Sequence, residues 1–202
     1  MQPEHQALIV IDMQNDFCPG GALGVAGGDE ILTGINGLMA DCATVVLTQD
    51  WHPADHRSFA SSHPGRDPFA MIDMPYGPQV LWPDHCVQGT SGADLHPDLD
   101  TNRAHLVLRK GFRAEVDSYS AFFENDKTTA TGLEGYLRNR GVTEVAFVGL
   151  ALDFCVAWSA IDAARLGFRA SVRPDLCRAI DLDGSLTAAL AAMRAAGVRL
   201  ED

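Results

Sequence analysis

Residues 142–166 read VTEVAFVGLALDFCVAWSAIDAARL. The apolar run from Val142 to Leu150 is typical of a buried strand, and the spacing of apolar residues from Phe154 to Leu166 predicts a helix directly after it. Gly167 follows as a helix stop signal. A buried strand that leads through a short turn into a helix is the repeating unit of an α/β fold.

The same strand and helix signals recur along the chain. Further strands are predicted at Ala7 to Ile11, Ala43 to Thr48, His105 to Leu108, Arg169 to Val172 and Val198 to Leu200, and further helices at Glu30 to Ala40, Gly132 to Asn139 and Ser185 to Ala195. Their alternation predicts an α/β fold of three layers, with one mostly parallel sheet and helices on both of its faces.

The chain has no internal repeat or linker, and we expect one domain over residues 1–202. The region at about 51–104 is the exception to the alternation, because it carries most of the prolines, several histidines and little periodicity. A loop region of this length inside a compact domain is usually functional.

Composition narrows the classes of function. The 202 residues are 47% hydrophobic and 21% charged, which is typical of a globular protein, and the net charge of −12 disfavours nucleic acid and anionic membranes as partners. No apolar run approaches the length of a membrane span. The five cysteines are widely spaced and form no Cys-x-x-Cys motif, so we expect a reducing, cytoplasmic location.

Polar side chains stand at the carboxyl ends of the predicted strands. Asp12 and Asp50 follow the first two strands, and Lys110 follows the third. Cys155 lies just after the fourth, near the start of the following helix. The carboxyl ends of parallel strands share one edge of the sheet, where ligands bind in doubly wound folds. We therefore expect these residues to form one site.

Cys155 is the candidate nucleophile. Asp153 is a good N-cap for the predicted helix, and both the helix start and a nearby Lys110 are expected to lower the pKa of the thiol. Asp12 can take the thiol proton and later return it to a leaving group, which is the arrangement needed for acyl transfer from an amide. The alternative is that Cys155 is a small buried hydrophobe, Asp12 a turn residue and Lys110 a solvated strand end.

The long loop region contains candidate metal ligands. Asp50, His52 and His56 fall within seven positions, and His85 lies later in the same region. Imidazoles with a carboxylate suit zinc, iron or manganese, and open coordination positions would remain for water or substrate. The alternative is a polar, histidine-rich surface loop.

The chain also resembles a known family in six segments, taken in order along nearly its whole length. It is similar to the nicotinamidases of the isochorismatase-like cysteine hydrolase superfamily. The resemblance rests on IDMQNDFCPGGAL (11–23), DWHPADHRSFASSHPG (50–65), LWPDHCVQGT (81–90), RKG (109–111), DSYSAF (117–122) and VGLALDFCV (148–156).

The resemblance implies a role for each candidate residue. It implies Cys155 as the nucleophile, Asp12 as general base and then acid, and Lys110 as the cation that supports the thiolate. It implies that Asp50, His52 and His85 bind one divalent metal ion, zinc before iron or manganese, with His56 a ligand in some relatives and a more distant group in others.

The resemblance further implies a substrate pocket and an oxyanion site. Phe17 and Trp82 match residues that sandwich a pyridine ring, and Tyr119 matches an aromatic residue of the pocket wall; the alternative for all three is core packing. The superfamily has a cis peptide bond at the position of Leu150–Ala151, which turns the backbone N–H groups of Ala151 and Cys155 toward the oxyanion.

One departure concerns Leu152, where many relatives have threonine. The leucine removes a hydroxyl that could brace the loop or a water molecule, and it leaves the nucleophile and the oxyanion donors in place.

The expected activity is hydrolysis of nicotinamide to nicotinate and ammonia through a cysteine thioester, as a step of NAD salvage, with pyrazinamide as a further substrate. The metal ion is expected to hold the ring through its pyridine nitrogen. The resemblance allows a monomer or a homodimer. The alternatives are another amidase or an isochorismatase of the same superfamily, and, from a different class, a non-catalytic metal-binding protein.

Overall fold

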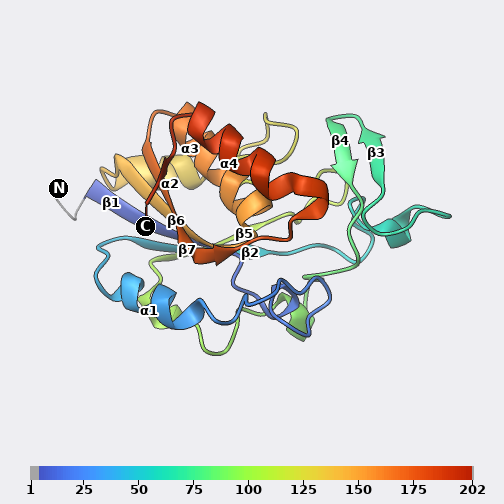
Figure 1. Ribbon diagram of the computed structural model, residues 1–202, viewed down its shortest axis with the longest axis horizontal. Coiled ribbons are helices and arrows are strands. Elements are labelled where there is room, and N and C mark those ends of the chain that lie inside the picture. The colour runs from blue at the N-terminus through green and yellow to red at the C-terminus, as the bar shows by residue number, and fades with distance from the viewer. Residues whose placement is uncertain (1–4, 202) are drawn as a thin grey trace.

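The computed structural model describes residues 5–201, which form one six-stranded sheet between two layers of helices (Figure 1). The sheet order is β5-β2-β1-β6-β7-β8, and all paired neighbours are parallel. The strands are β1 (Gln6–Ile11), β2 (Val45–Asp50), β5 (Leu106–Lys110), β6 (Glu144–Leu150), β7 (Arg169–Arg178) and β8 (Arg199–Leu200). The predicted fold class is confirmed.

Four α-helices cover the sheet. One face carries α1 (Leu32–Ala40), and the other carries α2 (Leu133–Asn139), α3 (Ala157–Arg165) and α4 (Ser185–Ala195), as Figure 1 shows. Single helical turns lie at Asn15–Phe17, Ala60–Ser62, Ser91–Ala93, Thr101–Arg103, Leu182–Gly184 and, as a π-helical turn, Leu152–Val156. None of the helices within residues 5–201 is long and apolar enough to cross a membrane.

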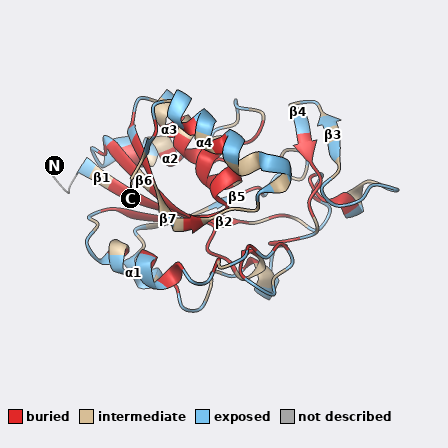
Figure 2. Ribbon diagram, in the orientation of Figure 1, coloured by how far each residue is buried: buried red, intermediate tan, exposed pale blue. Residues whose placement is uncertain are grey.

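Burial explains why the central strands could be recognised from sequence. Strand β2 is buried at every position, and β1 and β6 are buried at all but one position each (Figure 2). A strand covered on both faces reads as a continuous apolar run. Strand β5 at the edge of the sheet is exposed or half-buried up to Arg109, and only Lys110 at its end is buried.

The order in which strands are added to the sheet reverses between β1 and β6. From β1 the chain continues to β2 on one side, whereas β6 lies on the other side of β1. The two strands come close at Gly149, where φ is +110° and an added Cβ would lie 2.2 Å from the Ile11 carbonyl oxygen. Only glycine fits this approach. The carboxyl ends that flank such a reversal form the crevice in which open α/β sheets bind ligands.

The region at 51–104 contains more regular structure than the sequence indicated. Strands β3 (Met71–Met74) and β4 (Gly77–Val80) form an antiparallel hairpin that stands apart from the main sheet in Figure 1. Its outer strand alternates between exposed and half-buried positions, so it lacks the apolar run of a core strand. The remainder of the region consists of turns and irregular backbone.

Candidate active site

Four adjacent strands bring the candidate residues to one edge of the sheet. Lys110 ends β5 and Asp50 ends β2, and the two are partners in the register of these strands. Asp12 directly follows β1, and Cys155 lies in the π-helical turn that follows β6. All four side chains are buried. The structure therefore brings together the residues that the strand ends indicated.

Lys110 contacts the other three residues of this cluster. Its Nζ lies 2.8 Å from Asp12 Oδ2, 3.1 Å from Asp50 Oδ1 and 3.6 Å from Cys155 Sγ. The ammonium also donates to the Ser118 carbonyl, at 2.8 Å. Burial alone would lower the pKa of Lys110, but the two carboxylates raise it well above its ordinary value, so the ammonium stays charged.

Asp12 is fixed on its other side by a hydroxyl. Thr48 Oγ1 donates to Asp12 Oδ1 at 2.6 Å and accepts from the Asp12 N–H at 3.0 Å. The backbone of Asp12 has a positive φ of 46°. Burial raises the pKa of the Asp12 carboxyl, although Lys110 opposes the shift. A carboxylate with a raised pKa is a better proton acceptor than an exposed one.

Burial also controls the protonation of the Cys155 thiol. The side chain is 7% exposed, and burial raises its pKa well above 9.0, although Lys110 acts in the opposite direction. The expectation of a lowered thiol pKa is therefore wrong, because loss of solvent outweighs the nearby cation. The resting thiol keeps its proton at neutral pH, and a base must remove it during attack.

The turn that carries Cys155 differs from the predicted helix start. Asp153 caps no helix; its carboxylate instead accepts from the N–H groups of Ile180 and Asp181 and from the Ser185 hydroxyl. The expected N-cap role of Asp153 is wrong because the turn is π-helical and its side chain faces the segment before α4. The peptide bond between Leu150 and Ala151 is cis, as the resemblance implied.

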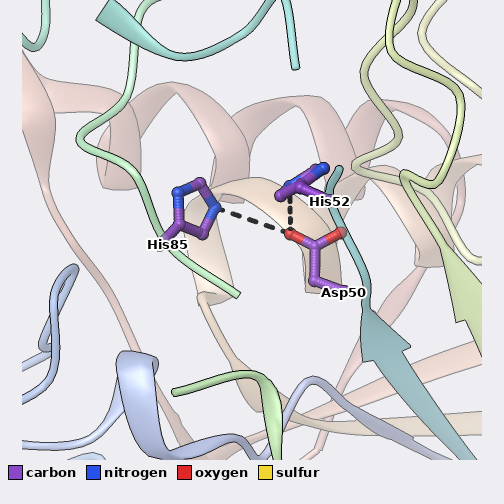
Figure 3. Close-up of side chains that lie close together, drawn as sticks. All are labelled: Asp50, His52 and His85. Carbon is purple, nitrogen blue, oxygen red and sulfur yellow. Dashed lines mark hydrogen bonds and ion pairs between the residues drawn. The ribbon is translucent and has the colours of Figure 1, made fainter. Parts of the chain in front are cut away.

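Three of the four candidate metal ligands converge beside this cluster. Nε2 of His52 lies 2.9 Å from Asp50 Oδ2, and Nε2 of His85 lies 3.6 Å from the same oxygen (Figure 3). The opposite ring nitrogens contact backbone carbonyls, His52 Nδ1 that of Gly111 and His85 Nδ1 that of Pro83, each at 2.8 Å. Such contacts fix the tautomer that leaves Nε2 free to bind a metal.

Backbone packing holds this donor set in place. Gly111 has a positive φ of 67°, and an added Cβ would lie 2.5 Å from His52 Cε1 and 2.8 Å from Asp50 Oδ1. A glycine at this position lets its carbonyl reach the His52 ring. The pKa of the Asp50 carboxyl, which burial alone would raise, is held well below its ordinary value by His52 and Lys110. The carboxylate is thus ionised, as a metal ligand must be.

His56 stands slightly apart from these three ligands. The ring nitrogen that could bind a metal lies within reach of His52 and Asp117, in a group separate from that of Asp50, His52 and His85. His56 Nδ1 accepts from the Ser58 N–H at 3.2 Å, and its buried Nε2 has no hydrogen-bond partner among the residues that the structure describes. A buried ring nitrogen left without a partner fits a group, such as a metal ion or its bound water, in this space.

A small pocket joins the metal donors to the cysteine. Asp50 and His85 lie on its wall together with Ala151 and Cys155, and aromatic rings complete it. The Trp82 ring lies 4.9 Å from Phe154 and 6.1 Å from Tyr119, both edge-on. The lining residues are Phe17, Leu23, Asp50, Trp82, His85, Asp117, Tyr119, Ala151, Phe154, Cys155 and Ile180. The pocket thus contains all three aromatic residues that the resemblance implied.

Sequence reasoning missed four residues of this lining. Asp117 belongs to the quoted DSYSAF segment and Phe154 adjoins the nucleophile, so both carried a signal that was not used. Leu23 closes the quoted segment 11–23 and so carried the same unused signal, whereas Ile180 comes from an irregular segment and carried none. Leu152 is buried outside the lining.

Comparisons with known proteins agree with this geometry. The family model for the isochorismatase domain matches residues 6–202. The chain is 57% identical over 198 residues to the nicotinamidase of Acinetobacter baylyi, covering 98% of this chain and 92% of the relative. The solved nicotinamidase/pyrazinamidase of Acinetobacter baumanii is 55% identical, with a TM-score of 0.97 over 99% of this chain and 97% of its own. The pyrazinamidase of Pyrococcus horikoshii, solved in complex with zinc, is 33% identical, with a TM-score of 0.78 over 98% and 99%.

Proposed function

The chain belongs to the isochorismatase family, and from this premise we propose that it is a nicotinamidase, which hydrolyses nicotinamide to nicotinate and ammonia. The observation that carries the proposal is the pocket, whose lining combines Cys155 with the metal donors Asp50 and His85 and with aromatic rings. Such a pocket suits a neutral aromatic ring that bears a carboxamide.

The first half of the proposed reaction uses Cys155 and Asp12. The sulfur attacks the carboxamide carbon as Asp12 takes the thiol proton, and the backbone N–H groups of Ala151 and Cys155 stabilise the oxyanion. Collapse of the tetrahedral intermediate breaks the C–N bond while Asp12 returns the proton to the leaving nitrogen, so that ammonia departs and a thioester remains. Lys110 contacts both groups, the Asp12 carboxylate at 2.8 Å and the sulfur at 3.6 Å.

The second half repeats the same proton transfers with water. Asp12 removes a proton from a water molecule, whose oxygen attacks the thioester carbon. The C–S bond then breaks, the sulfur recovers its proton from Asp12, and nicotinate leaves. Lys110, which lies between Asp12 and Cys155, stabilises the negative charge that develops on either group.

Asp50, His52 and His85 would hold a divalent metal ion, and we propose zinc. When bound, the ion supplies a coordination position for the pyridine nitrogen of the substrate. Two imidazole nitrogens and one ionised carboxylate oxygen are the donors that zinc prefers in sites with open positions. The zinc complex of the Pyrococcus horikoshii relative supports this choice.

The aromatic lining supplies the surfaces for the ring. Phe17 and Trp82 would enclose the pyridine from both sides, and Tyr119 would close the pocket behind Trp82, with which it shares a hydrogen bond. Stacking and burial then orient the carboxamide over the sulfur. Pyrazinamide has the same shape, so we propose it as a second substrate.

The rival substrate within the family is isochorismate. It is anionic, whereas the pocket lining contains Asp50 and Asp117 and, among the described residues, no arginine or lysine. A negative lining disfavours an anion, so the amide is the better substrate.

We also propose a role in NAD salvage and a cytoplasmic location. The proposed product, nicotinate, contains the pyridine ring of NAD, which supports the role in salvage. All five cysteines are free thiols, which suits a reducing compartment.

A substrate panel tests the proposal. Purified protein is assayed for ammonia release from nicotinamide, pyrazinamide and benzamide, and for hydrolysis of isochorismate. We expect turnover of the first two, weak turnover of benzamide, which lacks the ring nitrogen, and none of isochorismate. Hydrolysis of isochorismate without ammonia release from nicotinamide contradicts the proposal.

A further inference from the structure

Gln79 is a buried amide at the end of the β3–β4 hairpin, and the proposed reaction does not use it. It is 1% exposed, lies in β4, and reaches from the hairpin to the loop after β5. Its Nε2 lies 2.9 Å from Tyr119 Oη, 2.8 Å from Asp117 Oδ2 and 2.7 Å from the Val80 carbonyl oxygen. Two of these three partners are side chains of the pocket lining.

The other end of the amide is held as firmly. Gln79 Oε1 accepts from Tyr76 Oη and from Asn125 Nδ2, each at 3.2 Å. Asn125 in turn accepts from the backbone N–H of Tyr119, at 3.0 Å. Because the oxygen already has two donors, the orientation of the amide is fixed, and its two N–H groups face Tyr119 Oη, Asp117 Oδ2 and the Val80 carbonyl oxygen.

Tyr119 is thereby held at both of its ends. Its hydroxyl accepts from Gln79 Nε2 and from Trp82 Nε1, at 2.9 and 3.0 Å, and its backbone is held by Asn125. The Tyr119 ring lies 5.7 Å from Phe154 and 6.1 Å from Trp82. Loss of the Gln79 donor would leave the hydroxyl with one partner and the Asp117 carboxylate with fewer donors in a buried setting.

We propose that Gln79 is a positioning residue for the substrate ring, acting through the Tyr119 hydroxyl and the Asp117 carboxylate. This inference rests on the proposed function, because its readout is nicotinamide hydrolysis. Gln79 does not line the pocket. Its effect therefore falls on ring binding, while the thiol, the base and the oxyanion donors keep their geometry.

The test compares Gln79→Met with Gln88→Met. Methionine matches the length of glutamine and removes both hydrogen-bonding groups, and Gln88 is an exposed glutamine whose amide donates to the Trp51 carbonyl. For Gln79→Met we expect KM for nicotinamide to rise about tenfold with kcat within about twofold of the parent. Gln88→Met should change neither. An unchanged KM, or a fall in kcat alone, in folded Gln79→Met protein overturns the inference.

Tyr119→Phe provides the second variant, since it removes only the hydroxyl that Gln79 holds. It should raise KM as well, and the double variant should raise KM by less than the product of the two single effects. Independent, multiplicative effects exclude action through the hydroxyl. Circular dichroism shows whether each variant is folded, and where Gln79→Met does not fold, an unchanged KM in Tyr119→Phe overturns the inference. A parent protein that releases no ammonia from nicotinamide refutes the proposed function instead, so the two failures are distinguishable.

Discussion

The Lys110 ammonium lies 3.6 Å from the Cys155 sulfur, and both side chains are buried. The same ammonium contacts Asp12 at 2.8 Å and Asp50 at 3.1 Å. One lysine thus links the candidate nucleophile, the candidate base and a candidate metal ligand. Without its charge, two carboxylates would remain buried close together with no cation between them.

Replacement of Lys110 by methionine should therefore be severe. We expect kcat/KM for nicotinamide to fall about 10³-fold, because charge on Asp12 and Cys155 loses its stabilising partner. The matched control is the chain's other lysine, Lys127, which pairs with Asp162; neither residue lines the pocket. Lys127→Met should keep kcat/KM near that of the parent. Comparable losses in the two variants would argue against a specific role for Lys110.

The state of the Cys155 thiol predicts how its alkylation depends on pH. Because burial raises the pKa of the thiol above 9.0, the reactive thiolate is a small fraction at neutral pH and grows as pH rises. The rate of Cys155 alkylation by iodoacetamide, followed by peptide mass spectrometry, should increase about tenfold from pH 7 to pH 8. Cys155→Ser protein gives the background from the other cysteines. A rate independent of pH from 6 to 8 would indicate a preformed thiolate.

Metal content tests the donor set of Asp50, His52 and His85. Purified protein should carry about one divalent ion per chain, and His52→Ala should lose it together with activity. His96→Ala is the control, since His96 lies near Asp98 and outside the donor set. The measurement is elemental analysis before and after chelation, with zinc added back. Full activity in protein shown to be free of metal would contradict the site.

The close approach of β6 to β1 predicts a large effect on stability. Gly149→Ala places a Cβ 2.2 Å from the Ile11 carbonyl oxygen at a φ of +110°, so we expect a loss of roughly 2–4 kcal/mol in the free energy of unfolding. Gly135, inside α2, has open space around it, and Gly135→Ala should stabilise the protein by about 0.5–1 kcal/mol. Urea denaturation measures both, and equal midpoints would contradict the packing argument.

Most of the architecture could be predicted from sequence because its signals are local. The apolar runs at Ala7 to Ile11 and Val142 to Leu150 indicate strands buried on both faces, and α4 begins and ends at the predicted residues. The strand ends then indicated that Asp12, Lys110 and Cys155 would meet. That these three residues share one edge of the sheet follows from the parallel topology alone.

The features that could not be predicted from the sequence depend on tertiary contacts. The β3–β4 hairpin has no apolar run, because β3 alternates between exposed and half-buried positions and only Gln79 and Val80 of β4 are buried. The hydrogen bonds from Gln79 to Asp117 and Tyr119 could therefore not be predicted. The direction of the Cys155 pKa shift was wrong because the extent of burial cannot be read from a helix start. The Asp153 carboxylate binds a segment near Ile180 that lies far along the chain.

In the proposed reaction Cys155 forms a covalent bond to the substrate carbon. The most direct measurement is ammonia release from nicotinamide by Cys155→Ala protein that has been shown to fold and to retain its metal ion. We predict that turnover falls to the rate of the uncatalysed control, because no other group on the pocket lining can form the thioester. Substantial residual turnover by this variant would exclude Cys155 as the nucleophile.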